Sequence, residues 1–501
     1  MNIRQLRILA TLMPLSLCAC GGGGGTSQSS VTQPVSSGST PGSTPGSTSN
    51  PVPTISTLIP SCAPAGEQFI DGADNQLTVA APTDGLFVAG SVVRWNGSDR
   101  PTTYQPTSST GAPNAVTAQI SASDIAVAGT AVVTVFNPAP GGGSSNSLTF
   151  TITPGAVDPQ SIALDPAGMF AYVMNGGCNG GVGGYVSMYT INPTTGALAS
   201  IGPPVFTHDY GSYPQTVTVA PSGKFVYVTN SGNVYDPDDG SVAMYSINAT
   251  TGALTSTGTI YGNCPGLCFP SSVVVDPSGK FAYVPSGGGG FPFNIGVYTI
   301  NATTGALASL GTIAAGTDPV SIAVDPSGKF AYVANANVGS AGNVSMYAIN
   351  ATTGALTSMG TIVAGTDTVA VAVDPAGKFA YVTNSGSNDV SMYTIDATIG
   401  ALTSMGTIAA GTDPVAVAVD PAGKFAYVTN SGSNDVSMYT INSTTGSLTL
   451  IGVIAAGLSP TSIAIHPTGK FAYVTNSGSN DVSMYSIGSA GTLTLIATIG
   501  T

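Results

Sequence analysis

Charged side chains are scarce in this 501-residue chain, and cationic ones above all. Only 7% of the residues are charged, the formal net charge is −13, and the only arginines are Arg4, Arg7, Arg94 and Arg100. Proteins that bind nucleic acids neutralise the phosphate backbone with clustered lysine and arginine. This composition therefore excludes a nucleic-acid partner.

A membrane-spanning run is lacking in the N-terminal segment, where the apolar stretch of residues 8–17 is too short to cross a bilayer as a helix. Apolar residues nevertheless make up 42% of the chain, which is enough for a large core. The 66 glycines and 35 prolines favour many short strands joined by tight turns. We therefore expect an all-β protein.

Residues 1–19 have the pattern of an export signal, with Arg4 and Arg7 before the apolar run. The run ends in Leu17-Cys18-Ala19-Cys20, which resembles the bacterial lipobox, so Cys20 is the expected lipidation site; an ordinary secretory signal is the alternative. By the sorting rule of lipoproteins, Gly21 after the anchor implies export to the outer membrane. We expect a protein of the bacterial cell envelope whose partner is the membrane, through a lipid anchor.

The next two segments differ sharply in composition. Residues 20–53 are almost wholly Gly, Ser, Thr and Pro, and such a segment is expected to be an unfolded tether. Residues 54–153 alternate apolar stretches with turns, as in a small β-sandwich. Ser91-Val92-Val93-Arg94-Trp95-Asn96-Gly97 and Asn137-Pro138-Ala139-Pro140-Gly141-Gly142 resemble the IPT/TIG immunoglobulin-like family, which implies a spacer or cohesion module.

Four cysteines remain if Cys18 leaves with the signal and Cys20 is lipidated: Cys62, Cys178, Cys264 and Cys268. An even number is expected in an oxidising compartment. A disulfide between Cys264 and Cys268 would close a small loop, and Cys62 with Cys178 would then join two domains. A metal site is the weaker alternative, because no histidine lies near the Cys264 pair in sequence.

The strongest pattern is a repeat within residues 154–501. An apolar strand, an Asp-Pro-small-Gly-Lys turn and Phe-Ala-Tyr-Val recur in seven copies, with Met169 in place of lysine in the first. The first turn residues, at spacings of 55, 56, 49, 49, 46 and 46 residues, are Asp165, Ala220, Asp276, Asp325, Asp374, Asp420 and His466. These spacings match a four-stranded propeller blade, and the units are too rich in strands for a helical solenoid.

One copy, residues 414–456, shows how each unit is expected to fold. Its apolar stretches predict strands over 415–419, 425–429, 436–441 and 447–454, separated by turns rich in proline, glycine and asparagine. The copies begin at an inner strand and end at an outer one, so no strand is expected to be exchanged between the first and last blades. The predicted fold is a seven-bladed β-propeller over residues 154–501, preceded by a small immunoglobulin-like β-sandwich.

The repeat also resembles a known family. Phe425-Ala426-Tyr427-Val428-Thr429-Asn430 and Gly446-Ser447-Leu448 resemble the YVTN-type repeats of the seven-bladed lactonase-like propellers, which include bacterial 6-phosphogluconolactonases. The resemblance covers residues 157–501. It implies the propeller fold and, more weakly, a lactonase-like activity.

The longer loops should gather on one face of the ring, where strands two and three are joined and where blades are joined. They fall in blades one to three, and ligand-binding residues concentrate on such loops. We assign ligand binding there to Tyr210, Tyr213, Tyr235, Phe291 and Phe293. The alternative is that these loops only cover the mouth of the channel.

Two of these loops carry groups suited to chemistry. His208 with Asp209 is the His–carboxylate pair near them, and both are catalytic candidates, with a surface histidine of no role as the alternative. Carboxylates suited to Ca²⁺ occur at Asp236, Asp238 and Asp239, with a solvated acidic turn as the alternative. No other cofactor is expected.

Further polar residues recur on the same face: the pairs Asn388-Asp389, Asn434-Asp435 and Asn480-Asp481, and the carboxylates Asp318, Asp367 and Asp413. Their use in blade after blade indicates turn chemistry. His466 stands at the first position of a repeat turn, so we expect it to be structural.

A phosphosugar lactonase has to neutralise its substrate's phosphate, a task suited to arginine or clustered lysine. The repeat region contains no arginine, and each of its lysines closes the same repeat turn, on the face opposite the long loops. Our interpretation is a cell-envelope lipoprotein whose propeller binds a protein or glycan, or serves as a scaffold, through the variable loop face of blades one to three. The alternative is a lactonase-like hydrolase of a neutral lactone, so the sequence leaves open whether the protein is an enzyme.

Overall fold

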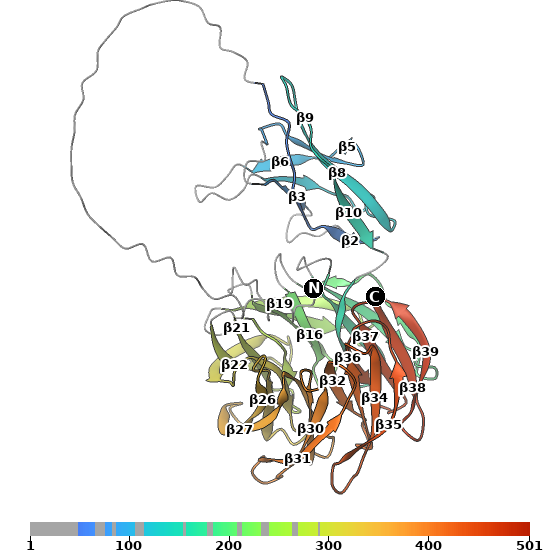
Figure 1. The fold of residues 1–501 in the computed structure, drawn as a ribbon. Coiled ribbons are helices and arrows are strands. Elements are labelled where there is room, and N and C mark those ends of the chain that lie inside the picture. The colour runs from blue at the N-terminus through green and yellow to red at the C-terminus, as the bar shows by residue number, and fades with distance from the viewer. Residues whose placement is uncertain are drawn as a thin grey trace, which may run out of the picture.

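The computed structural model describes residues 49–65, 76–82, 87–105, 115–153, 157–177, 184–207, 213–231, 240–262, 269–288 and 291–501. These residues form strands and turns, and none of their segments is a helix long and apolar enough to cross a membrane. The strands belong to two units, a pair of stacked sheets followed by a ring of seven sheets (Figure 1). The all-β prediction is confirmed.

The first unit consists of two sheets. One has the strand order β1-β3-β7-β6, with the strands β1 (Thr57–Ile59), β3 (Gln76–Ala80), β7 (Ala115–Gln119) and β6 (Thr102–Gln105). The other has the order β2-β10-β8-β4-β5, with β9 paired to β8: β2 (Cys62–Pro64), β10 (Leu148–Thr153), β8 (Gly129–Asn137), β4 (Val92–Trp95), β5 (Ser98–Asp99) and β9 (Gly143–Ser144).

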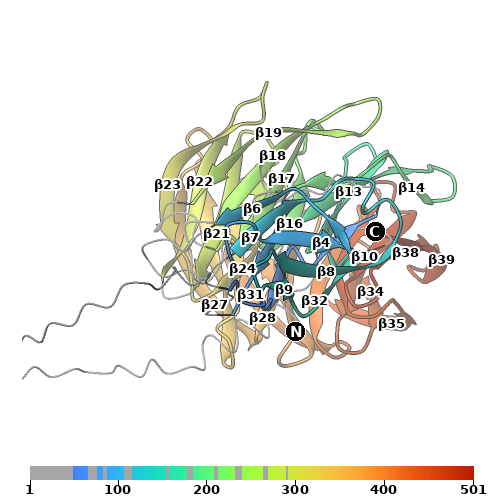
Figure 2. The ribbon, with the colours of Figure 1, turned by 90° about the horizontal axis from the view of Figure 1, so that it is seen from above.

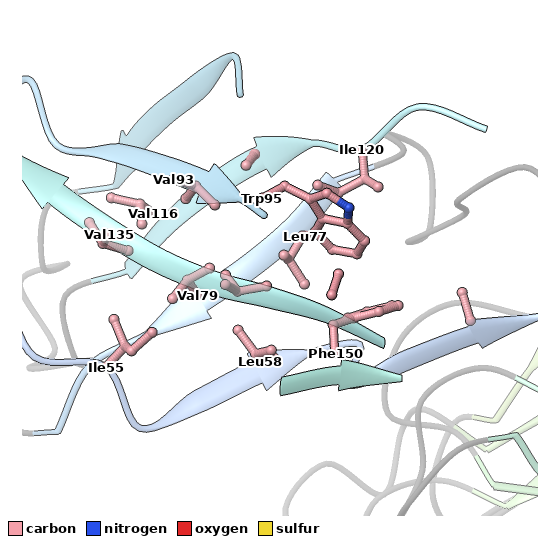
Figure 3. Packing of buried hydrophobic residues seen from close by; sticks show 14 of the residues in the cluster. Ile55, Leu58, Leu77, Val79, Val93, Trp95, Val116, Ile120, Val135 and Phe150 are labelled. Atoms are coloured by element: carbon pink, nitrogen blue, oxygen red, sulfur yellow. The ribbon is translucent and has the colours of Figure 1, made fainter. Parts of the chain in front are cut away.

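Alternate side chains of these strands meet between the two sheets. Leu77 and Val79 of β3 face Trp95 of β4 and Phe150 of β10, and all four are buried (Figure 3). The rings of Trp95 and Phe150 lie 4.9 Å apart, centroid to centroid. This period-two burial gives the small unit a core of its own. Its resemblance to the IPT/TIG family stays a prediction.

The second unit is a ring of seven sheets, whose strands follow in sequence order from the centre outwards (Figure 1, Figure 2). The first sheet has five strands, and each of the other six has four. The inner strands are β11 (Pro159–Leu164), β16 (Tyr213–Val219), β20 (Val274–Val275), β24 (Pro319–Val324), β28 (Thr368–Val373), β32 (Pro414–Val419) and β36 (Pro460–Ile465). The second strands are β12 (Phe170–Asn175), β17 (Phe225–Ser231), β21 (Phe281–Gly288), β25 (Phe330–Asn335), β29 (Phe379–Asn384), β33 (Phe425–Asn430) and β37 (Phe471–Asn476).

The two outer positions follow the same pattern. The third strands are β13 (Tyr185–Ile191), β18 (Ser241–Ile247), β22 (Phe291–Ile300), β26 (Ala341–Ile349), β30 (Asp389–Ile395), β34 (Asp435–Ile441) and β38 (Asp481–Ile487). The fourth strands are β14 (Leu198–Ser200) with β15 (Val205–Phe206), then β19 (Leu254–Tyr261), β23 (Leu307–Ala314), β27 (Leu356–Thr366), β31 (Leu402–Ala409), β35 (Leu448–Ala455) and β39 (Leu493–Gly500). The seven predicted blades are confirmed.

No described strand is exchanged where the ring closes, as predicted. The last blade pairs only β36 to β39, and the first only β11 to β15. Closure comes from side chains at this seam: the Thr461 hydroxyl donates to the Pro159 carbonyl at 2.9 Å. His466 Nε2 lies 2.9 Å from the Gly168 carbonyl, and Nδ1 lies 2.7 Å from the Thr468 hydroxyl. His466 is therefore structural.

A tyrosine of each second strand bridges to the next blade. Its buried hydroxyl donates to the carbonyl of a glycine in the turn before the next blade's fourth strand. The seven pairs are Tyr172–Gly252, Tyr227–Gly305, Tyr283–Gly354, Tyr332–Gly400, Tyr381–Gly446, Tyr427–Gly491 and Tyr473–Gly196, at 2.8–3.0 Å. The tyrosine of the repeated Phe-Ala-Tyr-Val thus joins neighbouring blades by a hydrogen bond.

Candidate functional site

The loop face is defined by where the inner strands start. At one repeat position, just ahead of each inner strand, six blades place a residue with φ between +49° and +63°: Asp158, Phe269, Asp318, Asp367, Asp413 and Ser459. Aspartate and asparagine tolerate this left-handed conformation better than most residues. The repeated carboxylates therefore serve the backbone, as the sequence predicted.

The Asn-Asp pairs serve the same turns. Asn388, Asn434 and Asn480 also have positive φ, and each side-chain oxygen accepts the backbone N–H of the residue that starts the next blade, at 2.7–2.8 Å. The following aspartates accept from an asparagine of their own blade; for example, Asp389 accepts from the Asn384 amide at 2.7 Å. The prediction of turn chemistry is confirmed for these pairs.

A β-bulge near the start of the inner strand follows in six blades. The residue at the bulge is polar in blades seven, one and two: Thr461, Gln160 and Gln215. It is a valine in blades four to six: Val320, Val369 and Val415. The start of the inner strands therefore has a polar side, in blades seven, one and two, and an apolar side, in blades four to six. Bulges redirect side chains and are common beside active sites.

Asp158 lies on the polar side, at the seam between blades seven and one. Its N–H donates to Asn480 Oδ1 at 2.8 Å, and its Oδ1 accepts from the Gln160 amide. Burial raises the pKa of Asp158 above the ordinary 3.8, and the Gln160 hydrogen bond opposes that rise only in part. A Cβ on Gly176 would lie 2.6 Å from Asp158 Oδ2, so the absence of a side chain at residue 176 makes room for the carboxylate.

Two neighbouring blades also hold a fully buried asparagine near the end of the second strand. Asn175 ends β12, and Asn230 is the last residue but one of β17. Both are fully buried, and among the described residues neither side-chain oxygen has a hydrogen-bond partner, which also holds for Asn335 of blade four. In blades five to seven the same oxygen accepts a backbone N–H, as Asn384 does from Gly365 at 3.1 Å. The residues equivalent to Gly365 in blades one and two, Ala156 and Gly211, lie outside the described residues.

The described part of the predicted site lies on two different strands. Tyr213 starts β16, an inner strand, and its carbonyl accepts from the Gln215 amide at 3.2 Å, beside the polar bulges. Phe291 and Phe293 both lie on β22, a third strand, and Phe293 packs where a Cβ on Gly287 would meet its ring. Tyr213 thus lies at the inner strands with Asp158, while the two phenylalanines belong to a more peripheral strand of blade three.

The other predicted site residues lie outside the described residues: Cys20, His208, Asp209, Tyr210, Tyr235, Asp236, Asp238, Asp239, Cys264 and Cys268. Within the ranges that the structure describes, no group of three or more His, Cys, Asp or Glu residues could hold a metal ion. Cys62, at the start of β2, is disulfide-bonded.

Sequence reasoning missed Asp158 and the buried asparagines of the second strands. The signal for Asp158 was present, because Val157-Asp158-Pro159 aligns with Thr317-Asp318-Pro319 and Thr412-Asp413-Pro414 in the repeat. Nothing in the sequence distinguishes Asn175 and Asn230 from Asn384, because the donor to Asn384 belongs to the backbone of a loop.

The ring of seven sheets is a seven-bladed β-propeller, and polar bulge residues of blades seven, one and two lie at the start of its inner strands. The family model "Lactonase, 7-bladed beta-propeller" matches residues 146–268, 259–373 and 361–464, well over half of the chain. The chain therefore belongs to the seven-bladed β-propeller lactonase family.

Individual relatives are more distant. A 6-phosphogluconolactonase of Formosa agariphila is 30% identical over 136 residues, 24% of this chain and 35% of that protein, so the match spans about a third of the relative. A candidate 6-phosphogluconolactonase of Bacteroides uniformis superposes with a TM-score of 0.55 at 19% identity, over 63% of this chain and 92% of its own. The periplasmic gluconolactonase of Pseudomonas aeruginosa gives 0.51 at 20% identity, over 66% and 93%. The structural likenesses support the fold.

Proposed function

We propose that this protein hydrolyses a neutral, polyhydroxylated lactone on the loop face of blades one and two. The observation that carries the proposal is Asp158, a half-buried carboxylate whose pKa is raised by desolvation, at the start of an inner strand in a member of the lactonase family. Carboxylates with perturbed pKa values are typical of general acids and bases.

The chemistry needs a base that activates water for attack on the lactone carbonyl. Asp158 can take the proton from that water, while the Gln160 amide orients its carboxylate. The polar side chains at the bulges of blades one and two, Gln160 and Gln215, offer hydrogen-bonding groups for substrate hydroxyls. A sugar lactone presents hydroxyls of this kind around its ring.

A neutral substrate follows from the positions of the cations. The propeller has no arginine, and its lysines close the turns of the opposite face. A phosphate at the loop face would therefore lack the charged, bidentate partners that phosphate recognition uses. Activity on a phosphorylated lactone should be much weaker than on the matching neutral one.

The test is hydrolysis of glucono-1,5-lactone and its 6-phosphate by the purified protein, against buffer, with Ca²⁺ and with chelator. We expect saturable turnover of the neutral lactone that is lost in Asp158→Asn. The His208→Ala variant tests the catalytic residue that the sequence predicted. If turnover is lost in His208→Ala and kept in Asp158→Asn, His208 is the general base. No turnover above buffer on any lactone would reject the enzyme proposal.

A binding or scaffold role is the second candidate. It is favoured by the later blades, which repeat Phe-Ala-Tyr-Val-Thr-Asn-Ser-Gly-Ser-Asn-Asp-Val without change at residues 379–390, 425–436 and 471–482. A protein or glycan would then be held by the variable loop face of a propeller anchored in the outer membrane through Cys20. Unchanged partner capture in Asp158→Asn, without lactone turnover in the wild type, would support this role.

A further inference from the structure

The turn between the first two strands of a blade is built around a buried carboxylate in five of the seven blades. In blade three, Asp276 Oδ1 accepts the backbone N–H groups of Lys280 and Phe281 at 2.8 and 2.7 Å, and Oδ2 accepts that of Ser278 at 3.1 Å. Equivalent bonds recur around Asp165, Asp325, Asp374 and Asp420. Three N–H groups thus converge on one carboxylate.

Blade two keeps this turn but lacks the carboxylate, because Ala220 stands in its place. The backbone is unchanged: Ala220 N–H donates to the Phe225 carbonyl at 2.9 Å, Gly223 N–H donates to the Ala220 carbonyl at 2.8 Å, and Gly223 has φ of +66°. Lys224 N–H turns to the Ser222 hydroxyl at a long 3.4 Å. Among the described residues, no side-chain acceptor takes the Phe225 N–H.

The space beside Ala220 is open. Elsewhere the proline of one turn packs on the glycine of the next; a Cβ on Gly328, for example, would lie 3.6 Å from Pro277. A Cβ on Gly279 of blade three would meet nothing within 4 Å, so the turns of blades two and three stand apart. A hollow of about 310 Å³ lies between the two turns and is lined by Ala220, Ser222, Lys224, Phe225, Pro277 and Ile300.

We infer that this hollow is a binding site for the carboxylate of a small organic acid. The N–H groups of Ser222, Lys224 and Phe225 are held where the other blades bind a carboxylate of their own, and convergent N–H groups form anion sites. The Lys224 side chain at the rim adds a positive charge. Apolar walls from Pro277 and Ile300 suit the carbon skeleton of the acid. The site lies on the face opposite Asp158 and is independent of the proposed hydrolysis.

The test uses ¹³C-acetate with the whole protein, followed by saturation-transfer NMR and titration, with acetamide and matched chloride as controls. We expect one saturable acetate site of millimolar affinity and none for acetamide. Ala220→Asp supplies a tethered carboxylate, so it should weaken acetate binding at least tenfold and raise the melting temperature by a few degrees, ~2–4 °C. Gluconate and a peptide carboxylate, as further ligands, distinguish a sugar acid from a chain terminus.

A second variant keeps the test decisive if Ala220→Asp folds poorly. Asp276→Ala recreates the vacant turn in blade three, and it should raise the number of acetate sites from one to two. Acetate binding that is absent in the wild type, or that is equal in wild type and Ala220→Asp, would overturn the inference. Equal binding of acetamide would show that the hollow does not select a carboxylate and would overturn it as well.

Discussion

The hydroxyl of Tyr473 donates a 2.9 Å hydrogen bond to the carbonyl of Gly196, although 277 residues separate the two in sequence. The bond joins the last blade to the first. The same bond joins each of the six remaining pairs of neighbouring blades. The first and last blades are thus joined by the same tyrosine–glycine hydrogen bond as the other blades.

Replacing Tyr473 with phenylalanine should lower the free energy of unfolding by about 1–3 kcal/mol, because the Gly196 carbonyl would be left buried without its donor. Denaturant unfolding measures the loss. Tyr381→Phe is the matched control, since its 2.8 Å bond to Gly446 lies within the ring. Similar losses are expected; a far larger loss for Tyr473→Phe would mean that the seam is weaker than the other contacts between blades.

Gly446→Ala should be strongly destabilising. Gly446 has φ of +75°, and a Cβ there would lie 2.2 Å from the Phe379 ring of the preceding blade. Left-handed strain and overpacking together should cost roughly 2–4 kcal/mol. Gly202→Ala is the control, because nothing lies within 4 Å of its Cβ position and its φ is not positive. Equal effects of both substitutions on thermal unfolding would contradict this account.

Asp158→Asn should lower kcat/KM for a neutral lactone by roughly 100-fold or more, the usual contribution of a general base. Asparagine tolerates the φ of +63° and keeps an acceptor for Gln160. Asp318→Asn, at the same position of blade four, is the matched control and should retain turnover. Wild-type kcat/KM should rise with pH through the pKa of Asp158, which lies above 3.8.

The same substitution makes a separate prediction for stability. A carboxyl whose folded pKa is raised binds its proton more tightly in the folded state, so folding stability falls as pH rises from the unfolded pKa through the folded one. Asp158→Asn removes the ionisable carboxyl and with it this loss of folding stability at higher pH. Its melting temperature at pH 7 should equal or exceed that of the wild type, whereas a clear decrease would show that the ionised carboxylate supports the fold.

Reduction should destabilise the small sandwich, because Cys62 is disulfide-bonded. Loss of a native disulfide typically costs 2–5 kcal/mol. Peptide mapping without reductant should recover Cys62 joined to Cys178, and Cys264 joined to Cys268, as the sequence predicts. Recovery of Cys62 with Cys264 or Cys268 would contradict that pairing.

Lipidation at Cys20 is testable by labelling cells with a fatty-acid analogue. The wild-type protein should carry the label and fractionate with the outer membrane, and Cys20→Ser should abolish labelling while leaving export signals intact. Cys18→Ser is the control and should still be labelled. A labelled Cys20→Ser protein would place the anchor elsewhere.

The strands of blade six, the one copy for which bounds were predicted, agree with the structure to within a residue. The predicted strands 415–419, 425–429, 436–441 and 447–454 correspond to β32, β33, β34 and β35, because turns with proline, glycine and asparagine mark both ends of each apolar stretch. The seven copies of the repeat then predicted the number of blades.

The site could be predicted only in part. Tyr213 was found because it stands near a long loop, whereas Asp158 was missed because it resembles the turn aspartates Asp318 and Asp413. What distinguishes it is its place at the seam between two blades that lie at opposite ends of the sequence. Whether the asparagine oxygens of Asn175 and Asn230 have donors depends on the path of loop backbone, which no residue pattern reports.

The absence of a shared strand at the seam has a consequence for how such a gene can change. Each blade is encoded by one uninterrupted stretch, and its borders with both neighbours are made of side chains and turns. Duplication of such a stretch inserts a whole blade without cutting any sheet, and the unchanged segments at residues 379–390, 425–436 and 471–482 have the form of copied cassettes. By the same logic, the ring should tolerate circular permutation, with new ends opened between any two blades and the old ones joined by a short linker.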